Sequence, residues 1–335
     1  MHVFKLVSPV LNFGDDMNDW FWDEIFPEHR EVYTDAMLLG IGSILWKQNF
    51  EAADQIVVLG SGVGVGVLPR KLPRHLRFSW VRGPMTAKAL DLDRGAALTD
   101  PASLCPLLDR FADRPSSTKR TVFVPHVGTA GLDIEWDRVA ADADVDYVTP
   151  AADGDAVIKR IAAADLVITE SLHGAIIADA FRVPWVPISL SPSFNHYKWR
   201  DWASSLEMDV RVEPGLVHLN RAYAFLTTAR RLLKGQFRRP ITANEDPTSD
   251  IHVPAVAMAG NRTFGISKDD KGDVRRIIKR FHGLVERMIA RDLRRVKTSK
   301  AFLSKEGVLR ARQDAMMGRI DLLRQERASL FVPRI

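Results

Sequence analysis

The chain has 335 residues, 46% of them hydrophobic and 27% charged, a balance typical of a globular protein long enough for two α/β domains. Cys105 is the only cysteine, which excludes an internal disulfide and a metal site built on cysteines. The longest uncharged run, Gln55–Pro69, is shorter than the roughly 20 residues of a membrane-spanning helix. Because the N-terminus lacks the pattern of a secretory leader, we expect a soluble cytoplasmic protein.

The net charge of +5 is distributed unevenly. The segment from Lys271 to Ile335 contains 18 Lys and Arg against 7 Asp and Glu, a net +11, and the rest of the chain carries −6. Such a segment attracts anionic lipid head groups or nucleic acid, and the alternative is a solvated helix face. We expect peripheral contact with the anionic surface of the inner membrane and no binding of nucleic acid.

Four short apolar segments in the first half have the composition of buried strands. They are predicted at Val3–Val7, Ala36–Gly40, Gln55–Leu59 and Phe78–Val81. A turn at Asn12–Asp16 follows the first strand and leads into an aromatic amphipathic helix at Met17–Phe26. Asp15 and Asp16 lie in this turn, where helix capping is the alternative to a role in binding.

The loops after the third and fourth strands differ in chemistry. The glycine-rich loop around Gly62 is not a dinucleotide fingerprint, because Val65 stands where glycine is needed and no acidic residue follows at the ribose position. It permits close approach of a substrate or of another backbone. Arg82 follows the fourth strand at the start of a helix, where its planar guanidinium suits a phosphate or carboxylate. A salt bridge to a neighbouring loop is the alternative for Arg82.

The second half repeats the alternation after a polar linker at Arg110–Arg120. Strands are predicted at Thr121–Val124, Val145–Val148, Leu166–Thr169 and Trp185–Ile188, and helices at Ile134–Ala143, Gly154–Ala163 and Ala175–Phe181. His126 lies in the loop after the first of these strands. Alternation of strands and helices in both halves predicts an α/β fold with two parallel sheets.

The pattern becomes helical towards the C-terminus. Helices are predicted at Ala222–Leu233, Val274–Val296 and Val308–Leu323, and a loop-like stretch at Pro240–Asp270. We therefore expect an N-terminal domain at residues 1–112, a second domain at residues 113–240, and a basic helical segment with its preceding loop at residues 241–335.

The stretch from Asp165 to Lys198 combines strand, turn, helix, second strand and loop. In doubly wound sheets, ligands bind outside the carboxyl ends of the strands, where helix N-termini attract anions. The residues expected at this position are Glu170, Ser171, His173 and Gly174. His173 can exchange a proton near neutral pH, although capping or packing is the commoner role of a lone histidine. Lys198 would reach the same place from the loop as a cation.

These pieces together resemble the polysaccharide pyruvyl transferase family from Asn12 to about Lys198. The resemblance is carried, in this order, by Asn12-Phe13-Gly14-Asp15-Asp16, Gly40-Ile41-Gly42-Ser43, Leu59-Gly60-Ser61-Gly62, Val81-Arg82-Gly83-Pro84, Thr99-Asp100-Pro101, Ser171-Leu172-His173-Gly174-Ala175 and Lys198. Within the family, the chain looks most like the bacterial enzymes that add pyruvyl ketals to exopolysaccharides of the succinoglycan type. The family often has Arg-x-x-x-Ser at the Arg82 position, where this chain has Thr86.

The resemblance implies a GT-B-like fold of two Rossmann-like domains with the active site between them. It implies phosphoenolpyruvate as the donor substrate, a lipid-linked oligosaccharide as the acceptor, and neither a cofactor nor a metal. Catalysis maps onto His173, and donor binding maps onto Arg82, Gly174 and Lys198. The candidates for acceptor contact in the cleft loops are Asp15, Asp16, Gly62, His126, Glu170 and Ser171.

Two other functions fit the same pattern, because fold does not fix function. One is a GT-B glycosyltransferase that uses a nucleotide sugar, although the sequence offers no convincing acidic ligand for a ribose. The other is a non-catalytic membrane-surface subunit of polysaccharide assembly, with the basic segment as its working part. The presence of Arg82, His173 and Lys198 argues against a vestigial site.

Overall fold

The computed structural model describes residues 1–5, 10–32, 34–64, 66–113, 117–191, 194–215, 239–241, 257–259 and 268–330. For residues 239–241, 257–259, 268–281 and 327–330 it describes the backbone alone. The predicted helix at Ala222–Leu233 lies outside the described residues, as does most of the loop-like stretch at Pro240–Asp270.

The first sheet is parallel and has four strands in the order β1-β2-β3-β4. Their bounds are His2–Val3, Met37–Leu39, Ile56–Leu59 and Leu76–Trp80. The four residues of β3 are all buried and apolar, as a central strand of a covered sheet requires. Alternate β3 side chains point to opposite faces, so that Val57 and Leu59 join one core while Ile56 and Val58 join another.

The second sheet is also parallel, with five strands in the order β6-β5-β7-β8-β9. Their bounds are Asp146–Tyr147, Thr121–Val124, Leu166–Thr169, Trp185–Ser189 and Glu213–Pro214. Val167 of β7 faces the core that the first sheet also contributes to, and Ile168 faces the opposite side. The prediction of an α/β fold with parallel sheets is thus confirmed, while the domain boundaries and the GT-B-like arrangement stay predictions.

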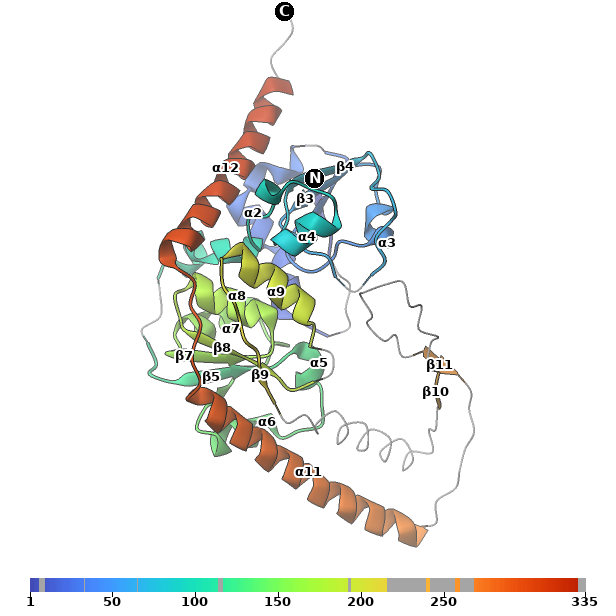
Figure 1. Ribbon diagram of the computed structural model, residues 1–335, viewed down its shortest axis with the longest axis vertical. Helices are drawn as coiled ribbons and strands as arrows, with labels where there is room; N and C mark the ends of the chain where they lie inside the picture. Colours follow the sequence, from blue (N-terminus) through green and yellow to red (C-terminus); the bar gives the residue numbers. More distant parts are fainter. Residues whose placement is uncertain are drawn as a thin grey trace, which may run out of the picture.

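Helices cover both sheets (Figure 1). The α-helices before the C-terminal segment are α1 (Phe13–Asp16), α2 (Phe21–Ile25), α3 (Lys47–Phe50), α4 (Pro84–Ala89), α5 (Val127–Ala130), α6 (Trp136–Asp142), α7 (Gly154–Ala162), α8 (Leu172–Ala180) and α9 (His196–Ser205). Short 3-10 turns supplement them at Met17–Asp19, Pro27–Arg30, Arg94–Ala96, Pro101–Leu107 and Asp109–Phe111. The α8 helix packs on the Pro101–Leu107 turn, which joins the two sheets through one core.

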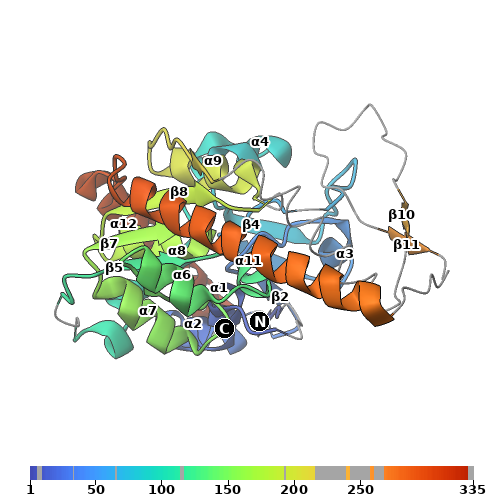
Figure 2. The same ribbon diagram turned by 90° about the horizontal axis from the view of Figure 1, so that it is seen from below.

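Two long helices end the described chain. The first, α11 (Lys268–Lys297), lies along the second sheet, where Val285, Ile289 and Leu293 are buried against α6 and the strands (Figure 2). The second, α12 (Glu306–Leu330), lies on the first sheet, as Figure 1 shows. Between them, Phe302 exchanges backbone hydrogen bonds with Trp185 of β8 at 2.7 and 3.0 Å. A short antiparallel pair, β10 (Arg239–Ile241) and β11 (Ala257–Ala259), interrupts the stretch that we expected to be a loop.

Several predicted elements were wrong in their limits or their kind. The helix expected at Met17–Phe26 is broken at Trp20, whose φ of −135° is not helical, and Phe13–Asp16 is a helical turn rather than an open loop. The helix expected from Ala175 already begins at Leu172. Lys198, expected in a loop, lies in α9, a helix that the sequence patterns did not reveal.

Candidate active site

Loops and first helical turns at the carboxyl ends of the strands in both sheets bring six charged or titratable side chains together. They are Asp15, Arg82, His126, Glu170, His173 and Lys198, which we call the inter-sheet cluster. The Lys198 ammonium group interacts electrostatically with Arg82, Asp15 and Glu170, and it also acts on both histidines. The structure therefore gathers predicted site residues from segments that are far apart in sequence.

The N-terminus of α8 places His173 in this cluster. Ser171 is the N-cap residue, and its hydroxyl accepts a hydrogen bond from the Gly174 amide at 3.4 Å. Gly174 is packed on Thr169, so that a Cβ atom there would lie 3.3 Å from the Thr169 Cβ and closer still to its hydroxyl. Ser171 and Gly174 thus have clear structural roles in forming the first turn, which presents His173.

The His173 ring is held between the two sheets. Phe13 meets it edge-on, with ring centroids 6.4 Å apart. Gly14 lies directly against the imidazole, since a Cβ atom on Gly14 would lie 2.5 Å from His173 Cγ. Nε2 of His173 is buried and has no hydrogen-bond partner among the described residues. A buried nitrogen without a partner is uncommon in proteins and is available to a ligand.

The environment strongly disfavours a charged His173. Burial, followed by the positive charges of Lys198 and Arg82, lowers its pKa to about 3. Burial and the positive charge of Lys198 also lower the pKa of His126, to about 4. Both imidazoles are therefore neutral at pH 7, and a bound anion would raise their pKa values by offsetting the nearby cations.

Lys198 lies in the first turn of α9. Asn195 caps this helix by accepting a hydrogen bond from the Lys198 amide at 3.3 Å. Burial and the charge of Arg82 lower the Lys198 pKa to about 8, although Asp15 and Glu170 act in the opposite direction. No described residue accepts a hydrogen bond from its ammonium group. Lys198 is thus a cation at pH 7 that has no fixed partner within the described part of the chain.

Arg82 is buried and engaged in an ion pair. Its side chain is 1% exposed, and its Nε donates to Asp201 Oδ2 at 3.2 Å. Its Nη1 donates to Ser43 Oγ at 2.5 Å, and a Cβ atom on Gly62 would lie 2.6 Å from its Nε. The salt bridge weighed as the alternative role of Arg82 is therefore present, but its partner lies in α9. Whether Arg82 also contacts the donor substrate stays a prediction.

Asp201 was missed by the sequence analysis, although it links the first sheet to α9. Its carboxylate accepts from the Thr86 amide at 2.8 Å and from the Thr86 hydroxyl at 2.7 Å, in addition to Arg82. Thr86 also accepts from the Val63 amide at 3.1 Å. The hydroxyl group four residues after Arg82 therefore holds Asp201 and the Val63 amide in place, and threonine supplies this group as well as serine would. Only the position of Asp201, close to Lys198, hinted at this role.

Glu170 and His126 organise the loops of the second sheet. The Glu170 carboxylate accepts from the backbone amides of Leu190, Ser191 and His126 at 3.0, 2.8 and 3.2 Å. His126 is the N-cap residue of α5, and its Nδ1 accepts from the Gly128 amide at 3.1 Å. Because these contacts satisfy both residues, they support the loops around Lys198, and their expected contact with the acceptor stays a prediction.

Asp15 and Asp16, in the α1 turn that follows β1, have carboxylates with different roles. Asp16 accepts from the Asn12 amide at 2.7 Å and stabilises the α1 turn. Asp15 accepts from the Asn12 side chain at 2.7 Å and faces Gly42, whose φ is +116°. Burial raises the pKa of Asp15, and Lys198 partly offsets this effect. Capping therefore explains Asp16, whereas Asp15 belongs to the inter-sheet cluster.

Asp100 is a second acidic residue that the sequence analysis did not place in the site. Its Oδ1 accepts from the Ala102 amide at 3.0 Å, while its Oδ2 is buried without a partner among the described residues. Burial raises its pKa to about 6, against the opposing charge of Arg82. The described residues contain no group of three acidic, histidine or cysteine side chains arranged to hold a metal ion.

Comparison with known proteins identifies the family of this chain. A sequence model of the family "Polysaccharide pyruvyl transferase" matches residues 13–192, a span that contains five of the six members of the inter-sheet cluster. The succinoglycan biosynthesis protein ExoV of Rhizobium meliloti (strain 1021) is 37% identical over 227 residues, which cover 67% of this chain and 68% of that protein. No solved structure matches the chain. On this evidence, the chain belongs to the polysaccharide pyruvyl transferase family.

Proposed function

We propose that the protein moves the pyruvyl group of phosphoenolpyruvate onto a sugar of a lipid-linked exopolysaccharide repeat unit, forming a pyruvate ketal and releasing phosphate. The observation that carries the proposal is the proximity of His173 and Lys198. In the described part of the chain, the His173 Nε2 and the Lys198 ammonium group have no hydrogen-bond partner. His173 lies within the matched family region, and Lys198 follows that region by six residues. Family membership supports a transferase of pyruvyl groups. The similarity to a succinoglycan biosynthesis protein supports an exopolysaccharide as the product.

Phosphoenolpyruvate requires a site for two anionic groups. Lys198 supplies a cation, and the first turn of α8 supplies amide groups with the positive end of the helix dipole, including the amide of Gly174. Arg82 is held by Asp201 and Ser43, so its contribution to the site is a positive potential. We infer that Lys198 makes the principal side-chain contact with the phosphate or the carboxylate.

Ketal formation requires movement of two protons. A proton is delivered to the methylene carbon, a sugar hydroxyl attacks the resulting cationic carbon, and phosphate leaves with the electrons of its C–O bond. The second hydroxyl then closes the ring. One of the two hydroxyl protons returns to the acid that gave its proton to carbon. The other is taken up by the departing phosphate. A single histidine can serve as acid and then as base in this sequence.

The low pKa of His173 constrains this assignment. The ring is neutral before the donor binds, because its pKa is about 3. The negative charge of the bound donor would raise this pKa by neutralising Lys198. We therefore propose that His173 becomes protonated only when the donor is bound. The residue then acts as an acid only in the presence of substrate. Preorganised charge in the same place would stabilise the transition state.

The proposed acceptor places the protein near a membrane. No described helix is long and apolar enough to cross one. On α11, Arg287 and Arg291 are exposed and have no carboxylate partner among the described residues, whereas Arg295 and Lys297 pair with Glu213 and Asp144. We propose that the unpaired arginines of α11 contribute to peripheral attachment at an anionic surface on the cytoplasmic side.

The test is release of phosphate from phosphoenolpyruvate by the purified protein, with and without a lipid-linked oligosaccharide. Mass spectrometry of the acceptor should detect the ketal. Acceptor-dependent release of phosphate with ketal formation is the expected result. Transfer of sugar from a nucleotide sugar, without consumption of phosphoenolpyruvate, would instead support a glycosyltransferase. Absence of both reactions, with the fold intact, would contradict enzymatic activity on these substrates.

A further inference from the structure

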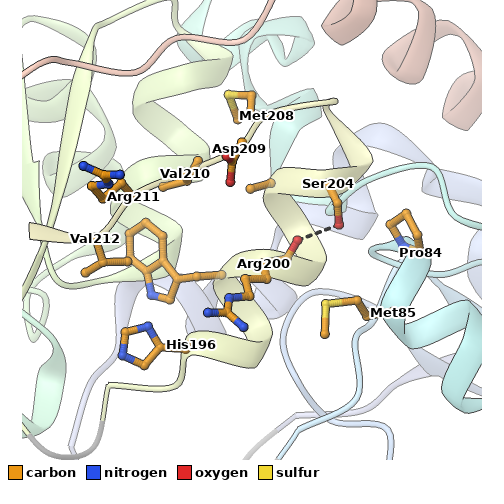
Figure 3. A pocket seen from close by; sticks show the side chains of 12 residues that line it. Pro84, Met85, His196, Arg200, Ser204, Met208, Asp209, Val210, Arg211 and Val212 are labelled. Carbon is orange, nitrogen blue, oxygen red and sulfur yellow. Dashed lines mark hydrogen bonds between the residues drawn. The ribbon is translucent and has the colours of Figure 1, made fainter.

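A pocket of about 790 Å³ lies beside α9, within the size range of small-ligand sites (Figure 3). Its walls come from α9, from the start of α4 and from the segment that follows α9. Its lining includes Met85 of α4, Trp199 and Arg200 of α9, and Met208, Asp209 and Arg211 of the following segment. We call it the α9 pocket. None of its lining residues belongs to the inter-sheet cluster.

The α9 helix separates this pocket from the proposed donor site. Lys198 and Asp201 lie on the helix face that meets the inter-sheet cluster. Arg200 and Ala203 lie on the face that lines the pocket, as the periodicity of 3.6 residues per turn requires. Pro84, at the other wall, follows Arg82 by two residues. One helix diameter, about 10–12 Å, therefore separates the two sites, a span that an oligosaccharide can bridge.

The chemistry of the pocket favours a ligand with both an apolar face and a negative charge. Its accessible apolar surface comes from half-buried side chains that include Met85, Met208 and Val210. The ring of Trp199 lies behind them, 1% exposed, and stacks on Phe194 with a centroid distance of 5.2 Å, which makes this wall rigid. Arg200 and Arg211 are exposed at the rim and have no carboxylate partner among the described residues. His196 lies one turn before Arg200 on the same helix. Among the described residues that line the pocket, Asp209 is the only acidic one, so their combined charge is positive.

Resting on the proposed function, we propose that the α9 pocket binds an anionic portion of the acceptor and so holds the saccharide while its reactive hydroxyls reach the inter-sheet cluster. Sugar rings pack their C–H faces on aromatic and apolar side chains, and arginine pairs with phosphate or carboxylate. The anionic group has two possible sources, the phosphate that joins the sugar to its lipid or an acidic sugar of the chain. Both share the chemistry of an oxyanion attached to a sugar ring.

The methionines of the pocket provide a direct test. Met85 and Met208 line it, while Met17 and Met316 are fully buried in the core and serve as internal references. The full-length protein is labelled at its methionine methyl groups and titrated, by NMR, with glucose 1-phosphate, glucuronic acid and methyl glucoside. Saturable shifts of the Met85 and Met208 signals are expected with the anionic sugars and weaker ones with methyl glucoside. A preference between the two anionic sugars identifies the source of the charge.

Variants separate specific binding from general attraction. Arg200→Ala and Arg211→Ala should each weaken binding of the preferred anionic sugar at least about tenfold, the factor expected when one charge-assisted hydrogen bond is lost. The matched control is Arg310→Ala, which removes an exposed arginine on α12 and should leave binding unchanged. Absence of shifts at Met85 and Met208, binding of methyl glucoside as tight as that of the anionic sugars, or wild-type affinity in both pocket variants would each overturn the proposal.

A second measurement keeps this proposal distinct from the proposed function. The titration is repeated with saturating phosphoenolpyruvate, which should leave the Met85 and Met208 shifts unchanged. Loss of these shifts would show competition for one site and overturn the proposal of a separate pocket. If anionic sugars bind as expected but phosphoenolpyruvate yields no phosphate, the pocket assignment stands and the proposed reaction fails. If phosphate is released but the pocket variants bind the anionic sugar like the wild type, the proposed reaction stands and the pocket assignment fails.

Discussion

Gly14→Ala is the sharpest test of how His173 is positioned. A Cβ atom at this position would lie 2.5 Å from His173 Cγ, whereas ordinary van der Waals contact begins at 3.4 Å. Nδ1 of the same ring would lie closer still, so the imidazole must move by more than about 1 Å. A displacement of about 1 Å can already lower a rate roughly 10²-fold. This factor corresponds to about 2.7 kcal/mol of transition-state stabilisation. We expect a loss of that order in kcat.

The backbone at Gly14 does not explain such a loss. Gly14 lies in the α1 turn and is not among the described glycines with positive φ, which are Gly42 and Gly60. Alanine is favoured over glycine in helices by roughly 0.5–1 kcal/mol, so the substitution itself should not weaken the local structure. The measured loss would then report on the imidazole and not on unfolding.

The assay is acceptor-dependent phosphate release, with phosphoenolpyruvate affinity and the melting temperature measured in parallel. The matched control is Gly95→Ala, because a Cβ atom at Gly95 would meet nothing within 4 Å. Wild-type turnover by Gly14→Ala, with the melting temperature unchanged, would refute the reasoning that links the position of His173 to catalysis. A fall in both variants would point instead to a general sensitivity to alanine.

Four further results are expected. His173→Ala should lower kcat by about 10²–10⁴-fold with donor affinity kept, as for a general acid–base group, and near-normal turnover would make His173 structural. Arg82→Lys keeps the charge but cannot make both contacts to Asp201 and Ser43, so the charge is no longer held in place in the cluster. Calorimetry should therefore show weaker donor binding, together with about 1.5–3 kcal/mol lower stability in urea unfolding; unchanged affinity would leave Arg82 as an ion pair alone. The Lys198 pKa is about 8, and only the protonated form attracts an anion. Donor affinity, measured by calorimetry, should therefore fall as pH rises through this value or slightly above it. Lys198→Met should remove this pH dependence. Co-sedimentation with vesicles should increase with anionic lipid, decrease with salt and weaken in the double variant Arg287→Glu, Arg291→Glu; binding that ignores lipid charge and salt would count against membrane attachment.

The strands and their order along the chain could be predicted because their signal is local. Runs such as Ile56–Leu59 and Leu166–Thr169 are short, apolar and β-branched, and a parallel sheet buried on both faces requires this composition. The positions of His173 and Arg82 near the carboxyl ends of strands follow from the same pattern, because each comes within four residues of the end of a strand. The local pattern was therefore enough to find the candidates, but not their partners.

The features that were missed depend on contacts between distant segments. The sequence of α9 mixes buried tryptophans with polar residues and lacks a continuous apolar stripe, so its pattern did not predict a helix. The contact between Arg82 and Asp201 spans 119 residues, and no periodicity indicates it. The break at Trp20 also depends on tertiary packing, since Arg110 lies 4.1 Å above its ring and Phe111 meets its edge.

The position of α12 has a consequence for the order of events during synthesis. Leu309, Met316, Ile320 and Leu323 of this helix complete the core beneath the first sheet, although the strands of that sheet end at Trp80. At a translation rate of roughly 5–20 residues per second, Ile320 is made about 12–48 s after Trp80. During this interval, the apolar surface that α12 later covers lacks the side chains that α12 supplies in the complete fold. Premature termination between the two segments would therefore release a product with an incomplete core and exposed apolar surface. Chaperones and proteases act on such products.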